Sequence, residues 1–172
     1  MTEAELKKHL EAAEKSPKEI AAAVSGLSDK VLRYKPAPDK WSVQEILAHL
    51  EDVEEHGMRA RVAAMIGQNE PVLVPFDQEK RLVEMRYNRK DPRRTLASFT
   101  RQRQANLKWL RTLKPAQLKR KGIHQTVGEI TAGEMIHEWA FHDLGHLKQI
   151  LEVKRYSLWP RIGNMRAFYK LS

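Results

Sequence analysis

The sequence contains no cysteine and no long run of apolar residues, and each absence excludes a class of protein. Without cysteine there can be no disulfide framework, no thiolate metal site and no cysteine nucleophile, so His, Asp or Glu would have to hold any metal. No apolar stretch approaches the roughly 18 to 20 residues that a membrane span needs, and residues 1–10 lack the apolar centre of a secretion signal. We therefore expect a soluble, cytoplasmic protein that has no membrane partner.

Acidic residues are scarce in one part of the chain. Between Lys80 and Lys121 there are 15 Lys and Arg residues against two acids, so this segment carries +13 and the rest of the chain −4. A basic excess can indicate nucleic-acid binding. However, only Trp109 accompanies these basic residues and no docking motif is present, whereas single-strand binders use repeated aromatic platforms. A solvated basic face is the favoured interpretation, and nucleic acid is not the expected partner.

Signals for β-structure are also few, because alternating patterns are rare and no Asn-Gly turn is present. Helical signals are frequent: capping boxes, with Glu three residues after Ser or Thr, occur at residues 16–19, 42–45 and 131–134. Together with apolar residues at helical spacing, they predict four main helices, over residues 2–26 with a break or kink at Pro17, 42–66, 91–113 and 131–153. Connectors with little regular structure are expected over residues 28–40, 67–77 and 116–130, and a short helix over residues 79–87. The prediction is an all-α four-helix bundle that forms a single domain over residues 1–172.

Two histidines lie four residues apart on the apolar stripe of the last predicted helix. His142 and His146 are neighbours on that face and could hold one ion, whereas His137 is expected on the opposite, solvent-facing side. The alternative is a pair of neutral core histidines, each hydrogen-bonded to a neighbouring helix. Each buried ring nitrogen that stays unpaired costs about 1 to 3 kcal/mol, and a metal would satisfy such nitrogens directly. Spacing and burial therefore favour a metal site.

A third ligand is expected from a facing helix, because metal sites in bundles draw on several helices. His49 lies beside the apolar stripe of the helix predicted over residues 42–66 and is the natural candidate. His56, two turns further along the same edge, is the weaker alternative. The expected site is thus a divalent ion held by His49, His142 and His146.

Other polar residues close to these stripes have less certain roles. Arg103 lies on the apolar stripe of the helix over residues 91–113, so it must be paired or reach solvent. We expect pairing with an acid of a neighbouring helix, and the alternative is that Arg103 anchors a carboxylate of a substrate or thiol cofactor. Glu138 and Asp143 are close to His142 and could accept a hydrogen bond from it or act as a base, yet both could equally face solvent. No general base is assigned.

Two stretches of the sequence, KWSVQEILAHLEDVEEH and HDLGHLKQI, resemble the DinB/YfiT-like superfamily of four-helix bundles. The family pattern is a Trp-Ser or Trp-Thr cap on a second helix that carries one histidine, followed by HxxxH on the last helix, and the other helical segments match in order. The resemblance implies a site on His49, His142 and His146 that binds zinc or nickel and leaves positions open. It also implies a metal-dependent enzyme, either a hydrolase or a thiol-dependent transferase with a low-molecular-weight thiol as cosubstrate.

Three functional classes follow from these observations. The first is a metal-dependent transferase or hydrolase that acts on a small-molecule substrate, and an open three-histidine site would favour it. The second is a non-catalytic binding or regulatory bundle with a structural or vacant metal site, which a fourth protein ligand would favour. The third, less favoured, is a nucleic-acid-associated protein, which would need a continuous basic surface. A homodimer is compatible with each of them.

Overall fold

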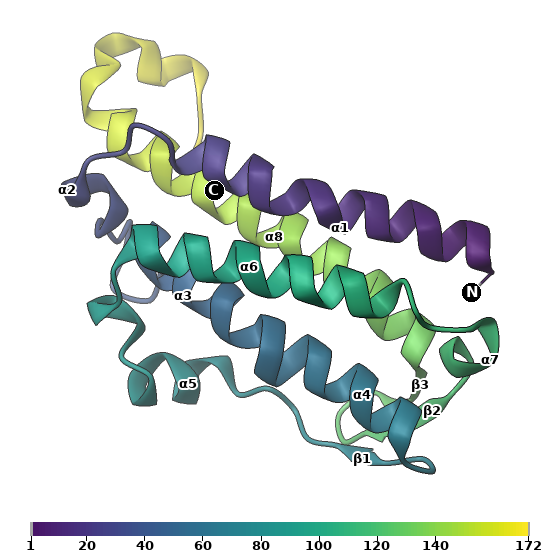
Figure 1. Ribbon diagram of the computed structural model, residues 1–172. Coiled ribbons are helices and arrows are strands. Elements are labelled where there is room, and N and C mark those ends of the chain that lie inside the picture. Colours follow the sequence, from purple (N-terminus) through teal and green to yellow (C-terminus); the bar gives the residue numbers. More distant parts are fainter. Residues whose placement is uncertain (1, 172) are drawn as a thin grey trace.

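The computed structural model describes residues 2–171, and its main feature is a bundle of four long helical segments (Figure 1). These segments are α1 (Glu3–Val24), the continuous run of α3 (Val43–Val53), η1 (Glu54–Arg59) and α4 (Ala60–Gly67), α6 (Pro92–Leu110) and α8 (Ala132–Leu158). The predicted all-α four-helix bundle is therefore confirmed. In the part of the chain that is described, no helix combines the length and apolar character needed to cross a membrane.

The order of the helices in the bundle differs from a simple up-and-down arrangement. In Figure 1, α1 and α8 run in one direction, whereas the run from α3 to α4 and α6 both point the opposite way. α1 packs on α8 and α6, and α3 packs on α6. The chain must therefore return along the bundle between α4 and α6, and this return carries β1 (Val72–Leu73), α5 (Gln78–Glu84) and η2 (Tyr87–Arg89).

The N-terminal caps explain where three of the long segments begin. The side chains of Thr2, Ser42 and Thr131 each accept a hydrogen bond from the backbone N–H of a Glu three residues later, and the carboxylate of that Glu accepts one from the backbone N–H of the cap residue. The predicted capping boxes at residues 42–45 and 131–134 are therefore confirmed. The expected break at Pro17 is wrong, because α1 continues through this buried proline. Its buried face spans the proline on both sides, and this packing outweighs the lost backbone hydrogen bond.

The second long segment contains one π-helical stretch, η1, between α3 and α4. A Cβ on Gly57 would collide with the side chain of Val53, so the packing of this stretch requires glycine. Glu54, the first residue of η1, is completely buried. π-helical turns are uncommon and often occur at functional sites, so the position of Glu54 indicates a functional region.

The segment predicted as irregular over residues 116–130 is partly regular, which corrects that expectation. It contains most of α7 (Pro115–Leu118) and an antiparallel hairpin of β2 (Lys121–His124) and β3 (Gly128–Thr131), and β2 also pairs in parallel with β1. Gly128 has a φ of +82°, which favours glycine in the hairpin turn. The remaining short elements are α2 (Asp29–Leu32), η3 (Trp159–Arg161) and η4 (Gly163–Phe168).

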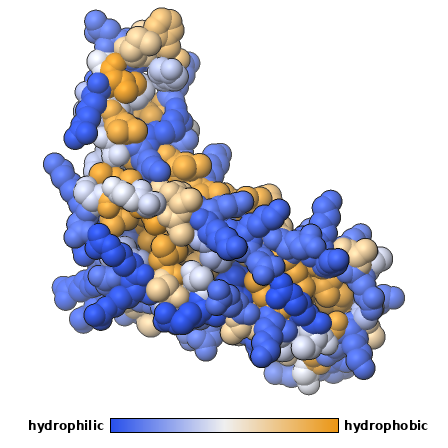
Figure 2. Space-filling model, turned by 45° about the horizontal axis from the view of Figure 1, so that its top comes forward, coloured by the Kyte–Doolittle hydropathy of each residue, from blue (hydrophilic) through white to orange (hydrophobic). Residues whose placement is uncertain are grey.

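A layer of buried polar residues divides the apolar core into two clusters. On α6, Phe99 belongs to one cluster and Leu107 to the other, and buried Arg103 lies between them. On α8, Ala140 and Ile150 are separated in the same way by buried polar residues. The outer surface is mainly hydrophilic on the face shown in Figure 2, with apolar side chains gathered in smaller areas. A functional site in the core is therefore expected within this polar layer.

Candidate metal centre

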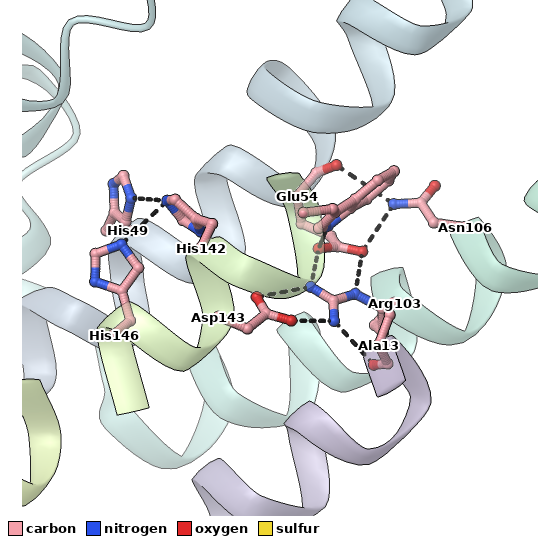
Figure 3. Close-up of polar contacts among 9 residues, drawn as sticks. Ala13, His49, Glu54, Arg103, Asn106, His142, Asp143 and His146 are labelled. Atoms are coloured by element: carbon pink, nitrogen blue, oxygen red, sulfur yellow. Dashed lines mark hydrogen bonds and ion pairs between the residues drawn. The ribbon is translucent and has the colours of Figure 1, made fainter. Parts of the chain in front are cut away.

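Three histidines from two helices meet between α3 and α8 (Figure 3). The Nε2 atom of His142 lies 3.1 Å from the Nε2 atoms of both His49 and His146. One nitrogen from each of the three rings lies within 4.8 Å of the others. Nitrogens bound to one zinc ion at about 2.0 to 2.1 Å must lie a little over 3 Å apart. The geometry therefore fits three ligands of a single divalent ion.

Burial keeps the three imidazoles neutral. His49 is 1% exposed and His146 8% exposed. Burial, reinforced by His146 and His142, lowers the pKa of His49 to about 2. Burial, followed by His146 and Arg103, lowers the pKa of His142 to about 3, and burial also lowers the pKa of His146. Neutral imidazole is the form that binds a metal, so the site needs no deprotonation at neutral pH.

The outer nitrogens of the three rings are not equally satisfied. The Nδ1 atom of His146 lies 2.8 Å from the Oε1 atom of Gln149, which can accept a hydrogen bond from it. The Nδ1 atoms of His49 and His142 are buried and have no hydrogen-bond partner within residues 2–171. A neutral imidazole carries one proton on its two nitrogens, so an ion at the Nε2 atoms fixes the proton on Nδ1. Gln149 is therefore the residue that can orient a ring of the cluster.

Two aromatic side chains cover the cluster from the connecting segments. The ring of Trp41 lies almost parallel to that of His146, at 8° with centroids 6.3 Å apart, and edge-on to His49 at 5.1 Å. Phe76 meets His49 edge-on at 5.7 Å. In the sequence, Trp41 is recognisable only as part of a helix cap, and Phe76 lies in a connector without a motif. Both rings therefore form part of the wall around the histidines.

No fourth ligand joins the cluster among the residues that the structure describes, since only the three histidines come together. His56, the weaker candidate, is exposed and pairs instead with Asp52, with Nδ1 and Oδ1 3.0 Å apart. His137 is half-buried rather than fully solvent-facing, and its ring contacts that of His9 on α1 at 3.7 Å. An ion at this site would therefore keep a position free for water or substrate.

Arg103 is not the ligand anchor that the sequence left open. Its side chain is 1% exposed, and its guanidinium donates to both carboxylate oxygens of Glu54 at 2.8 and 2.9 Å. It also donates to Asp143 at 2.5 and 3.0 Å and to the carbonyl of Ala13 at 3.0 Å (Figure 3). The expected pairing with acids of neighbouring helices is thus what the structure shows. The alternative, in which Arg103 anchors a carboxylate of a substrate or thiol, is not met, because no face of the guanidinium is open.

The acids near His142 also have defined surroundings. Asp143 is 2% exposed and faces Arg103 in the core, so it neither faces solvent nor contacts the outer nitrogen of a histidine. Glu138 is exposed, but partial desolvation by neighbouring groups raises its pKa, and the charge of Arg61 acts in the opposite direction. Glu138 lies one turn before His142 on α8 but is not part of the three-histidine cluster. The geometry assigns neither residue as a base.

Comparison with known proteins assigns the chain to a family. The model of the DinB superfamily matches residues 12–150, a range that includes all three histidines. A protein of Oceanobacillus iheyensis named "Putative metal-dependent hydrolase" is 25% identical over 144 residues, which cover 83% of this chain and 82% of that protein. The structure of YfiT from Bacillus subtilis, described as "a probable metal-dependent hydrolase with an unusual four-helix bundle topology", matches with a TM-score of 0.83. The match covers 91% of this chain and 90% of the YfiT chain. At 23% sequence identity, it shows that the two proteins share a fold. With more than half of its length matched by the family model, the chain belongs to the DinB superfamily.

Proposed function

We propose that the protein is a metal-dependent enzyme in which His49, His142 and His146 hold one divalent ion, zinc or nickel. One observation carries the proposal: three neutral imidazoles, two buried and one half-buried, converge with the Nε2 atom of His142 3.1 Å from those of His49 and His146, and no fourth His, Asp or Glu side chain joins them in residues 2–171. Three histidines with an open position are typical of catalytic rather than structural zinc sites. The names of the relatives from Oceanobacillus iheyensis and Bacillus subtilis are in keeping with this proposal.

The chain's own residues supply position and shielding at this site. When bound, a divalent ion lowers the pKa of a coordinated water or thiol and polarises a carbonyl. Helix α3 positions the ring of His49, and helix α8 positions the rings of the other two histidines. A hydrogen bond to Gln149 can fix the proton of His146 on Nδ1. Trp41 and Phe76 exclude water from the sides of the cluster. The proposed reaction is metal-assisted hydrolysis or transfer to a thiol, with a small molecule as substrate.

A thiol reaction would need an external thiol. The chain has no cysteine, so the sulfur nucleophile would have to come from a low-molecular-weight cosubstrate. Hydrolysis would need only water at the open position. The two reactions are therefore distinguished by whether product formation depends on added thiol.

The basic segment does not favour the competing nucleic-acid function. Several of its cations are paired with acids from other elements, which interrupts a continuous basic surface. These pairs include Arg81 with Asp52, Lys90 with Glu51, Arg93 with Asp29, Arg111 with Glu14 and Lys121 with Glu129.

The test is elemental analysis of protein purified without a histidine tag, followed by activity screens with the zinc-loaded and nickel-loaded forms. We expect about one divalent ion per chain in the wild type and little in His49→Ala or His142→Ala. Thiol transfer is assayed with bacillithiol, mycothiol and glutathione against a model electrophile, and hydrolysis with ester and amide substrates. Full metal occupancy without turnover in any assay would contradict an enzymatic function, and wild type that binds no metal would contradict the site itself.

A further inference from the structure

A pocket of about 380 Å³ lies beside the three histidines, between the connector from α2 to α3 and the C-terminal half of α8. Lys40 and Trp41 form part of one wall, and Lys148 and Gln149 form part of the other. Pockets of this size are suited to small organic molecules.

The pocket adjoins the histidine cluster through two shared wall residues. Two of its lining residues also contact His146: the ring of Trp41 stacks on the imidazole, and the Oε1 atom of Gln149 lies 2.8 Å from its Nδ1 atom. A molecule in the pocket would therefore be one side chain away from an ion at the histidines. This position suits a substrate that binds in the pocket and reacts at the ion.

The charge of the pocket favours an anion. Lys40 and Lys148 lie on opposite walls, are exposed, and form no ion pair with any residue in the described range 2–171. Glu152 is the one acid on the walls, and both of its carboxylate oxygens accept hydrogen bonds from Arg155 at 2.7 and 3.0 Å. Two cations thus remain available for a ligand, whereas the acid is already neutralised.

The rest of the wall favours an apolar body. Pro36, Trp41 and Val153 line the pocket with apolar surface. Trp41 already presents its ring to His146, and a flat or aliphatic group can pack on aromatic surface of this kind. The combination of apolar surface with a few placed charges is typical of sites for small organic ions.

We propose that this pocket binds the substrate or cosubstrate of the metal centre, and that this molecule is a carboxylate with an apolar body. The carboxylate lies between Lys40 and Lys148, and the apolar body packs along Trp41 toward His146. The assignment of the bound molecule as a reactant rests on the proposed function, but binding itself does not require the ion. In this proposal the lysines of the pocket take the anchoring role that the sequence left open as an alternative for Arg103.

Gly145 provides a way to close the pocket without disturbing the core. It lies within α8 and lines the pocket, although glycine is unfavourable inside a helix. A Cβ at this position would meet no atom within 4 Å, so a side chain there enters open space. Gly145→Leu is therefore expected to fold, to keep the three histidines and to fill the pocket.

Calorimetry measures the binding of 4-phenylbutyrate to chelator-treated protein and to zinc-loaded protein. The uncharged amide of 4-phenylbutyrate and the corresponding amine are measured in the same way for comparison. We expect the carboxylate to bind both forms and the amide and amine to bind at least about tenfold more weakly. The double variant Lys40→Ala with Lys148→Ala should weaken carboxylate binding by about tenfold or more, and Gly145→Leu should abolish it. The matched control, Lys18→Ala with Lys108→Ala, removes the same charge from exposed lysines elsewhere and should bind as the wild type does.

Zinc titration of each variant separates this proposal from the proposed function. The lysine variants and Gly145→Leu should bind zinc as the wild type does, whereas His142→Ala should lose zinc and keep carboxylate binding. Three results would overturn the proposal: no binding of 4-phenylbutyrate to the wild type, equal binding of the amine, or binding only to the zinc-loaded form. The last result would mean that the carboxylate coordinates the ion instead of occupying the lysine pocket.

Discussion

The carboxylate of Asp143 is held by Arg103 at 2.5 and 3.0 Å, one residue along α8 from His142. The same guanidinium holds Glu54, which directly follows the helix α3 that carries His49. One buried cation therefore connects the two helices whose histidines meet. Trp139 and Asn106 also donate to the carboxylate of Glu54, at 2.8 and 3.1 Å, so this acid is fully engaged.

We predict that Arg103→Met destabilises the fold by about 3 to 5 kcal/mol, because it leaves two buried carboxylates without their cation. Burial disfavours the charged guanidinium, but Asp143 and Glu54 outweigh burial and raise the pKa of Arg103. Denaturant unfolding of the metal-free protein measures the change. The triple variant Arg103→Met, Glu54→Gln, Asp143→Asn removes the charges together and should recover part of the loss. A change below 1 kcal/mol in the single variant would show that the pair is not essential to the fold.

The pH dependence of the metal-free protein should reflect its buried histidines. Their folded-state pKa values lie below the ordinary 6.5, at about 2 for His49 and about 3 for His142, so below pH 6.5 the unfolded chain binds protons that the folded chain excludes. The stability is therefore complete above pH 6.5 and falls as the pH drops toward 5, by up to about 1.4 kcal/mol per unit for each histidine.

The measurement is the unfolding free energy at pH 7.5, 6.5, 5.5 and 5.0 in the presence of chelator. His142→Gln removes one of these protons and should reduce the slope relative to the wild type. Equal slopes for the two proteins would mean that His142 titrates normally in the folded state. The restriction to pH 5 and above keeps the titration of most carboxylates out of the comparison.

The three histidines could be predicted from the sequence because helical periodicity determines on which face of a helix a residue lies. His142 and His146 share a face at a spacing of four, and His49 lies beside an apolar stripe. The partner of Arg103 could not be specified in this way, because Glu54 is buried at the start of a π-helical stretch whose only local signal is Gly57.

The residues that surround the site depend on contacts between distant segments. Trp41 and Phe76 lie on connectors, whose course is set by packing and not by a local pattern. Sequence patterns do not reveal the hairpin over residues 121–131, because its strands are four residues long and only partly buried, so their alternation is too short to recognise. Its pairing with β1 joins segments about fifty residues apart, which no short window of sequence reveals.

Gly57→Ala should destabilise the protein by about 1 to 3 kcal/mol, because the added Cβ overlaps the side chain of Val53. Gly67→Ala is the matched control. A Cβ there, at the last residue of α4, meets no atom within 4 Å, so its stability should change little or rise slightly. Thermal unfolding of the two variants compares them. An equal loss in both would show that helix propensity, and not the packing of η1, determines the result.

Removal of a bound ion should lower the melting temperature. An ion at a free concentration of about 1,000 times its Kd adds about 4 kcal/mol to the folded state. We therefore expect excess chelator to lower the melting temperature of the wild type and to leave that of His49→Ala unchanged. The metal content is measured in both samples before melting. An unchanged wild-type curve after confirmed removal of the ion would contradict a stabilising site.

Gln149 offers the sharpest test of how the cluster is oriented. Its Oε1 atom accepts from His146 at 2.8 Å, and its side chain lies at the protein surface, so Gln149→Met should leave the unfolding free energy nearly unchanged. Loss of such an acceptor typically weakens metal binding by about 10 to 100-fold. Gln149→Glu keeps an acceptor of the same length and should bind zinc at least as tightly as the wild type. Competition with a zinc chelator of known affinity measures all three proteins at pH 7.5. Equal affinities of the Met and Glu variants would show that Gln149 does not orient His146, whereas a loss in Gln149→Met alone would tie the affinity of the site to this hydrogen bond.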